Sequence, residues 1–224
     1  MPTPKAERFL AWSFSRLQDY RSCPYKAYLK HIKKLREPPN AAMERGAAVH
    51  VLAEQVVTDP RIPIPGELTT FSEEFHAVRH LSARETEKQV AFDRRWFPAE
   101  WFDMARAWVR VVIDLIYVQD GVLHIVDHKT GRQQAYHEEQ LSLYAVAGMI
   151  IYPEAAEVHS HLWYLDQGVA TSNVYLAEEL EPIKEAWEDK VAQMLADTAF
   201  EPTPSGEACR WCAFTAARGG PCKY

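Results

Sequence analysis

The residues best suited to chemistry lie in one stretch, residues 110 to 129, which reads RVVIDLIYVQDGVLHIVDHK. Two segments rich in valine and isoleucine flank Asp120-Gly121, a dipeptide that favours a two-residue hairpin turn. Counting outward from this turn in antiparallel register sets Asp114 directly opposite Asp127. Facing side chains in such a pair lie about 5 Å apart, and like charges at that distance repel each other. The pattern therefore predicts two carboxylates that share one small patch of a sheet.

These two carboxylates favour a cation between them, because hard divalent metals take oxygen ligands. Side chains alternate along a strand, so Lys129 lies on the same face as Asp127 while His128 points away. This arrangement predicts a metal-assisted hydrolytic centre in which Lys129 stabilises charge that develops on the substrate. The alternative is a plain hairpin with a surface acidic pair and a solvated lysine.

Four cysteines form a second group that could bind a metal. Cys209, Cys212 and Cys222 lie near the end of the sequence as C-x2-C-x9-C, and Cys23 stands far upstream. Thiolates in this number bind zinc or an iron–sulfur cluster. Zinc modules usually draw their ligands from two local pairs, so one remote cysteine with a terminal trio favours the cluster. Either centre would staple the C-terminal tail to the first helices, and the alternative is four independent buried thiols.

Length and composition are those of a globular protein with one sizeable core. The sequence has 224 residues, of which 47% are hydrophobic and 25% are charged. No apolar run approaches the roughly 20 residues that span a bilayer, and the first residues lack the apolar core of a signal peptide. We therefore expect a cytoplasmic protein with no membrane partner, whose thiols stay reduced.

The net charge of −6 disfavours nucleic acid as a partner, but the charge is unevenly spread. Residues 21 to 36 carry six Lys and Arg and no acidic residue, with Tyr25 and Tyr28 among them. Basic side chains beside aromatic rings suit a phosphate backbone with unstacked bases. A solvated helix face is the alternative, so this basic run permits a nucleic-acid partner without requiring one.

Hydrophobic periodicity and chain breakers predict alternating helices and strands, which favours an α/β fold with a mixed central β-sheet flanked by helices. The expected helices are 13–36 with a break at Cys23-Pro24, 41–57, 71–84, 136–151 and 180–196. The expected strands are 87–92, the two arms of the hairpin in 110–129, and a second hairpin of 158–165 with 169–176. The tail from residue 200 is expected to be irregular.

Three polar residues on these helices have ordinary roles by default. His50 lies beside the apolar stripe of the second helix, where a histidine is usually a satisfied core residue. Gln140 and Tyr144 stand one turn apart on one helix face, which suits packing for Tyr144 and solvent contact for Gln140.

Taken together, these motifs resemble the PD-(D/E)XK nuclease superfamily. More narrowly, they are similar to the RecB-like nucleases that carry a four-iron cluster, a group that includes the CRISPR adaptation nucleases. The opening pattern of that group, F-S-x-L-x-x-Y-x-x-C-P-x-x-x-Y, matches residues 14 to 28. Its helix histidine matches His50 in R-G-x-x-x-H, and its first acidic ligand matches Asp114 in V-V-I-D. Its D-x-K and Q-x-x-x-Y elements match 127–129 and 140–144.

The resemblance implies a restriction-endonuclease-like core in a single domain, 1–224, with 13–36 and 200–224 forming a subregion bound to a metal cluster. It implies phosphodiester hydrolysis with Mg²⁺ or Mn²⁺, in which Asp114, Asp127 and Lys129 are catalytic and Gln140 and Tyr144 position the DNA strand. The implied metal ligands are His50, Asp114, Asp127 and the backbone carbonyl of His128. The implied ligands of a 4Fe-4S cluster are Cys23, Cys209, Cys212 and Cys222.

The function implied is therefore a metal-dependent DNA exonuclease that acts on single-stranded DNA or on DNA with free ends. Proteins of recombination or CRISPR adaptation are the implied partners. One alternative is a DNA-binding or assembly module that keeps the fold and does no chemistry, although every proposed catalytic position carries a competent residue. Another is a protein stapled by zinc, in which both aspartates are structural.

Overall fold

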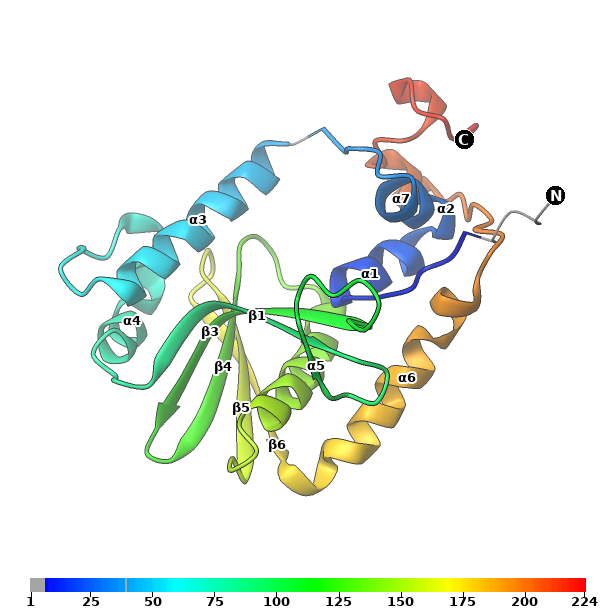
Figure 1. Ribbon diagram of the computed structural model, residues 1–224. Coiled ribbons are helices and arrows are strands. Elements are labelled where there is room, and N and C mark those ends of the chain that lie inside the picture. Colours follow the sequence, from blue (N-terminus) through cyan, green and yellow to red (C-terminus); the bar gives the residue numbers. More distant parts are fainter. Residues whose placement is uncertain (1–6, 39) are drawn as a thin grey trace. The chain divides into compact units, whose positions relative to one another are not determined.

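The computed structural model describes residues 7–38 and 40–224, which fall into two compact units (Figure 1). The smaller unit joins the two ends of the sequence, up to residue 38 and from 188 onward, and the larger unit is 40–187. The predicted subregion of 13–36 with 200–224 lies inside the smaller unit. The single domain expected over 1–224 stays a prediction.

The larger unit is built on a six-stranded sheet in the order β2-β1-β3-β4-β5-β6. The strands are β1 (Arg84–Phe92), β2 (Pro98–Ala99), β3 (Val109–Gln119), β4 (Val122–Lys129), β5 (Glu157–Tyr164) and β6 (Val169–Leu176). Strands β4 and β5 pair in parallel, and the other neighbours pair antiparallel. A parallel pair needs a long crossover connection, which helix α5 (Ala135–Ile151) provides. The mixed α/β sheet predicted from the sequence is confirmed.

The central hairpin of β3 and β4 has the turn that the sequence predicts. Asp120 and Gly121 have φ angles of 53° and 83°, and two consecutive positive φ angles are typical of a type I′ turn. Gln119 pairs with Val122, as counted from the sequence, and the same register continues to the pair of Leu115 and Val126. The β3–β4 pairing ends there, so the predicted pair of Asp114 and Asp127 lies one step beyond the last strand pair.

Helices cover both faces of the sheet in the larger unit (Figure 1). On one face, α3 (Ala41–Thr58), the 3₁₀ turn η2 (Gly66–Phe71) and α4 (Ser72–Val78) enclose a core that includes Leu115, Val126 and Trp163. Helix α5 packs on β3, β4 and β5, and its approach is close. A Cβ atom on Gly148 would lie 2.7 Å from Ile125 Cδ1 and 3.2 Å from Leu123 Cδ2.

The smaller unit brings the N-terminal helices together with the C-terminal tail. Its elements are α1 (Phe14–Ser22), α2 (Pro24–Ala27), the π-helical turn η1 (Tyr28–Ile32), α7 (Gly206–Arg210) and the 3₁₀ turn η4 (Ala216–Arg218). The ring of Tyr28 stacks on Phe200 at 5.0 Å between centroids. The Tyr20 hydroxyl donates a 2.8 Å hydrogen bond to Asp197. These contacts join residues that are more than 170 positions apart in the sequence.

Element boundaries differ from the sequence predictions in several places, among them β1, which begins at residue 84 rather than 87, and β2, which was not predicted. The first helical region breaks at Cys23 as expected but ends at Ile32, and the backbone turns at Lys34, whose φ is 58°. The helix expected over 71–84 is limited to α4, because Arg84 already pairs with Tyr117 in the sheet. The tail contains the short helix α7. The final long helix, α6 (Leu180–Ala196), follows the 3₁₀ turn η3 (Ala177–Glu179) and matches its predicted bounds.

Within residues 7–38 and 40–224, no helix combines the length and the apolar character that crossing a membrane requires.

Candidate active site

The first acidic residue of the site, Asp114, lies where β3 meets the end of β4. Its side chain is buried, and Oδ2 accepts a 2.7 Å hydrogen bond from the backbone N–H of His128. The imidazole of His50 on α3 places Nδ1 3.3 Å from the same oxygen. The structure therefore brings together a helix residue and a strand residue that the sequence separates by 64 positions.

The R-G-x-x-x-H segment of α3 explains why His50 reaches the sheet. The guanidinium of Arg45 binds both carboxylate oxygens of Asp166, at 2.9 and 2.5 Å. Gly46 allows the helix to approach the end of β4, since a Cβ atom there would lie 3.2 Å from Thr130 Oγ1. These two contacts set the position of the helix turn that carries His50.

The second acidic residue, Asp127, belongs to a ring of four side chains that three hydrogen bonds and one ion pair join. Lys129 Nζ lies 2.6 Å from Asp127 Oδ2 and donates a 2.9 Å hydrogen bond to Gln140 Oε1. Gln140 Nε2 donates to the Tyr144 hydroxyl at 2.6 Å, and that hydroxyl donates to Asp127 Oδ1. Gln140 therefore bonds within the site, whereas the default expectation for it was solvent contact.

A third carboxylate, on Glu87, joins this site and was not predicted from the sequence. His50, Glu87 and Asp114 each offer a ligand atom, and these three atoms all lie within 4.8 Å of one another. The β1–β3 register pairs residues on either side of Glu87 with residues on either side of Asp114. Glu87 itself has a φ of 48°, a left-handed conformation that is uncommon for a non-glycine residue and often found at functional sites.

The electrostatics of these groups indicate an excess of negative charge. Burial raises the pKa of Asp127, and the nearby Asp114 carboxylate raises it further. Burial also raises the pKa of Glu87, with a further contribution from Asp114. The hydrogen bond to Asp114 and the surrounding carboxylates raise the pKa of His50 to about 8. The site thus attracts positive charge, and its oxygen and imidazole donors suit Mg²⁺ or Mn²⁺.

Asp114 is the carboxylate in this group that ionises most readily. Burial alone opposes its negative charge, but the hydrogen bond with His50 and the interaction with His128 hold the pKa of Asp114 below its usual value. Two neighbouring carboxylates with pKa values moved in opposite directions are a common sign of a functional site.

Comparison with known proteins assigns the chain to a family. A model of the PD-(D/E)XK nuclease superfamily matches residues 11–217. The chain belongs to this superfamily. It is 24% identical to the Gene 69 protein of Mycobacterium phage D29, an alignment that covers 89% of this chain and 93% of the phage protein. The crystal structure of a "Putative exonuclease" from Eubacterium rectale shares the fold, with a TM-score of 0.51, 13% identity, and coverage of 91% of this chain and 86% of that one.

His128 occupies the middle of the D-x-K element of this PD-(D/E)XK chain, and its side chain is part of the core. The ring is buried beside Phe75 and Trp163, with centroids 5.5 and 5.7 Å away. Burial lowers the pKa of His128 to about 4. Its side chain therefore serves packing, and the role of its backbone carbonyl as a metal ligand stays a prediction.

Three of the six basic residues in the run of residues 21–36 pair with acidic neighbours. Lys26 and Lys30 each form ion pairs with both Asp19 and Glu37, at distances from 2.7 to 3.8 Å. Lys33 lies 2.9 Å from Glu7. These three lysines therefore mainly stabilise the smaller unit, and the run offers less charge to a phosphate backbone than the sequence suggests.

The four cysteines converge in the smaller unit. Cys23, Cys209, Cys212 and Cys222 line one predominantly apolar pocket, together with Leu29, Pro202 and Phe214 among others. Burial raises the pKa of the Cys212 thiol, and the neighbouring thiols of Cys23 and Cys222 raise it further. In the described part of the chain, no three of the sulfur atoms lie within 4.8 Å of one another.

Proposed function

We propose that this PD-(D/E)XK chain is a metal-dependent deoxyribonuclease that degrades DNA from an end. The observation that carries the proposal is the ring of Asp127, Lys129, Gln140 and Tyr144 directly beside the group of His50, Glu87 and Asp114. Acidic donors, an imidazole and an ammonium group in one place are the parts that hydrolysis of a phosphodiester requires. The name of the Eubacterium rectale protein supports exonuclease action as a proposal for this chain.

Asp114, Glu87 and His50, with Asp127 beside them, would hold Mg²⁺ or Mn²⁺. When bound, such an ion lowers the pKa of a water ligand and polarises a phosphoryl oxygen. Asp127 and Gln140 hold the ammonium of Lys129 by contacts of 2.6 and 2.9 Å. In this position Lys129 stabilises the negative charge that builds on the phosphate as the water oxygen attacks and the bond to the leaving oxygen breaks. Tyr144 fixes the orientation of Asp127 through its hydroxyl.

Digestion of end-labelled linear DNA and circular DNA with Mg²⁺ or Mn²⁺ tests this function. We expect linear single-stranded or duplex DNA to be shortened and circles to survive. Lys129→Ala should abolish cleavage, whereas Lys184→Ala, which removes a lysine that pairs with Glu181 on α6, should retain it. DNA binding without metal-dependent cleavage by the unaltered chain would instead identify a binding module, and cleavage of circles would reject the need for an end.

We further propose that the four cysteines bind a 4Fe-4S cluster. A single zinc ion would bring its four sulfur ligands to about 3.8 Å from one another, given zinc–sulfur bonds near 2.3 Å in a tetrahedron. Thiolates bound to four different irons stand further apart, which agrees with a pocket lined by four cysteines of which no three sulfur atoms lie within 4.8 Å of one another in the described part of the chain. On the resemblance alone, we also propose that the chain acts with proteins of recombination or CRISPR adaptation.

Anaerobic purification separates the two metals directly. If a 4Fe-4S cluster is bound, the protein should be brown and carry four irons per chain. Cys23→Ser should lose both the colour and the iron. A colourless protein with one zinc per chain would refute the cluster. A zinc ion would then link the C-terminal tail to the first helices.

A further inference from the structure

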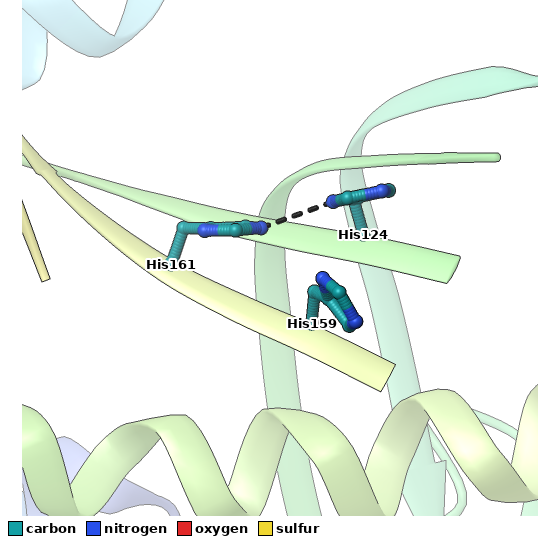
Figure 2. Close-up of side chains that lie close together, drawn as sticks. All are labelled: His124, His159 and His161. Carbon is teal, nitrogen blue, oxygen red and sulfur yellow. Dashed lines mark hydrogen bonds between the residues drawn. The ribbon is translucent and has the colours of Figure 1, made fainter. Parts of the chain in front are cut away.

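Three histidines form a separate group on the sheet of the larger unit (Figure 2). His124 lies on β4, and His159 and His161 lie on β5. The parallel register pairs His124 with His159, and His161 follows two residues later on the same face. One ring nitrogen from each histidine lies within 4.8 Å of the others.

The distance within this group suits two ligands of one metal ion. His124 Nδ1 and His161 Nε2 share a hydrogen bond of 3.1 Å, the dashed line in Figure 2, so the two nitrogens face each other. Two imidazole nitrogens bound to one tetrahedral zinc ion at 2.0–2.1 Å would lie about 3.4 Å apart. The sheet therefore already places this pair close to the spacing that an ion needs, and the third ring lies beside them.

The outer contacts of the three rings are those that usually orient histidine ligands. The Ser172 hydroxyl lies 2.6 Å from His161 Nδ1, and Glu157 Oε1 lies 3.2 Å from His159 Nε2. The ring of Tyr117 stacks on His124, at 4.8 Å between centroids and 3° between planes. Hydrogen-bond partners such as Ser172 and Glu157 fix the tautomer and the ring orientation of metal-bound histidines, and the stacked ring of Tyr117 restricts the orientation of His124.

The surroundings of His124 and His161 favour the neutral ring, in addition to the geometry. Burial lowers the pKa of His161 to about 4, and the neighbouring histidines contribute to that shift. Burial and His159 lower the pKa of His124 as well. Neutral imidazole is the form that binds a metal. The side chain of His159 is 28% exposed, so an ion can enter from solvent.

We propose that His124, His159 and His161 bind a transition-metal ion of the zinc type, with the remaining position open to solvent. Nitrogen ligands favour Zn²⁺, Ni²⁺ or Cu²⁺ over Mg²⁺, so this site differs in metal preference from the acidic one. His124 and Asp127 are three residues apart on β4, hence on opposite faces and about 10 Å apart along the strand. A bound ion would join β4 to β5 and stabilise the strand pair that carries the D-x-K element.

Zinc titration of the full chain tests this site without any nuclease assay. We expect His159→Ala and His161→Ala each to bind one Zn²⁺ fewer per chain than the unaltered protein. Each should also lose most of the rise in Tm that Zn²⁺ causes, because an ion that binds the folded state stabilises it by mass action. Ser172→Ala should keep the ligands and weaken Zn²⁺ binding by about 10-fold to 100-fold.

Matched controls separate this site from the other metal-binding groups. His76→Ala removes an exposed histidine on α4 and should leave the zinc count unchanged. Asp114→Asn should retain the zinc site, so failure of the nuclease proposal would not affect this result. Circular dichroism and Tm in the absence of Zn²⁺ establish that each variant folds. Folded His159→Ala and His161→Ala chains that bind as much zinc as the unaltered protein, with the same rise in Tm, would overturn the proposal.

Discussion

The acidic site and the cysteine group gather ligands in opposite ways. The acidic site takes oxygen and imidazole donors from adjacent strands and one helix of the larger unit, so the sheet sets their spacing. The cysteine group takes sulfur donors from the two ends of the sequence, around a pocket in the smaller unit. Hard donors on a rigid sheet suit a metal that exchanges with substrate and water. Soft donors that join distant segments suit a permanent centre whose binding energy contributes to folding. The two regions should therefore respond differently to mutation.

The largest expected effect is on catalysis, from Asp127→Asn or Lys129→Ala. Each should lower the rate of DNA cleavage by at least about 10²-fold to 10³-fold, since it removes charge stabilisation at the reacting phosphate. The iron content should not change, because neither residue belongs to the smaller unit. Single-turnover cleavage and iron analysis on the same preparations measure both. Undiminished cleavage by Lys129→Ala would contradict its catalytic role, and loss of iron would contradict the independence of the two regions.

The next effect is on stability, from Cys212→Ser. Loss of a metal ligand should destabilise the smaller unit by about 3 kcal/mol, because structural metal binding contributes directly to folding. Limited proteolysis should then cut within the C-terminal tail before it cuts the sheet, and the iron should be lost. Equal resistance and equal iron in the variant would contradict a stapling role. Ser205→Ala, at the N-cap of α7, is a control for general loosening of the tail.

A smaller effect is expected from Glu87→Gln, which tests the ligand that the sequence did not predict. The substitution keeps the size of the side chain and removes one negative charge from the group with His50 and Asp114. We expect Mn²⁺ affinity to fall on the order of 10-fold, with little change in Tm. The cleavage rate measured against Mn²⁺ concentration gives the change in Mn²⁺ affinity. The neighbouring Glu85→Gln, whose carboxylate pairs with Lys88, is the matched control, and an equal shift in both variants would remove Glu87 from the site.

The smallest effect is expected from Tyr144→Phe. The change deletes the hydroxyl that donates to Asp127 and accepts from Gln140, at a cost of about 1–2 kcal/mol in the free energy of unfolding. Cleavage should fall by about 10-fold or less, since Asp127 and Lys129 remain in contact. Urea unfolding and the cleavage rate measure the two effects. A loss of activity as large as that of Lys129→Ala would mean that Tyr144 acts directly on the substrate.

Much of the acidic site could be predicted because its parts are local in sequence. The Asp120-Gly121 turn sets the hairpin register, and counting outward from it gives the observed pairs from Gln119 with Val122 to Leu115 with Val126. The next step, which predicts Asp114 opposite Asp127, lies beyond that pairing and stays a prediction. Residues one helix turn apart, such as Gln140 and Tyr144, follow equally simple spacing. The role of His50 came from the resemblance to a family rather than from its helix, where an ordinary core histidine was the default expectation.

The tertiary structure alone determined the contacts that depend on pairing between distant segments. Glu87 enters the acidic site because β1 pairs with β3, and His124 meets His159 and His161 because β4 pairs in parallel with β5 across the whole of α5. The ion pair of Lys33 follows the same rule, since Glu7 reaches Lys33 only after the N-terminal segment folds back. A tight turn determines its own register within two residues. A long connection leaves the register to burial and packing over the entire sheet, which no local pattern encodes.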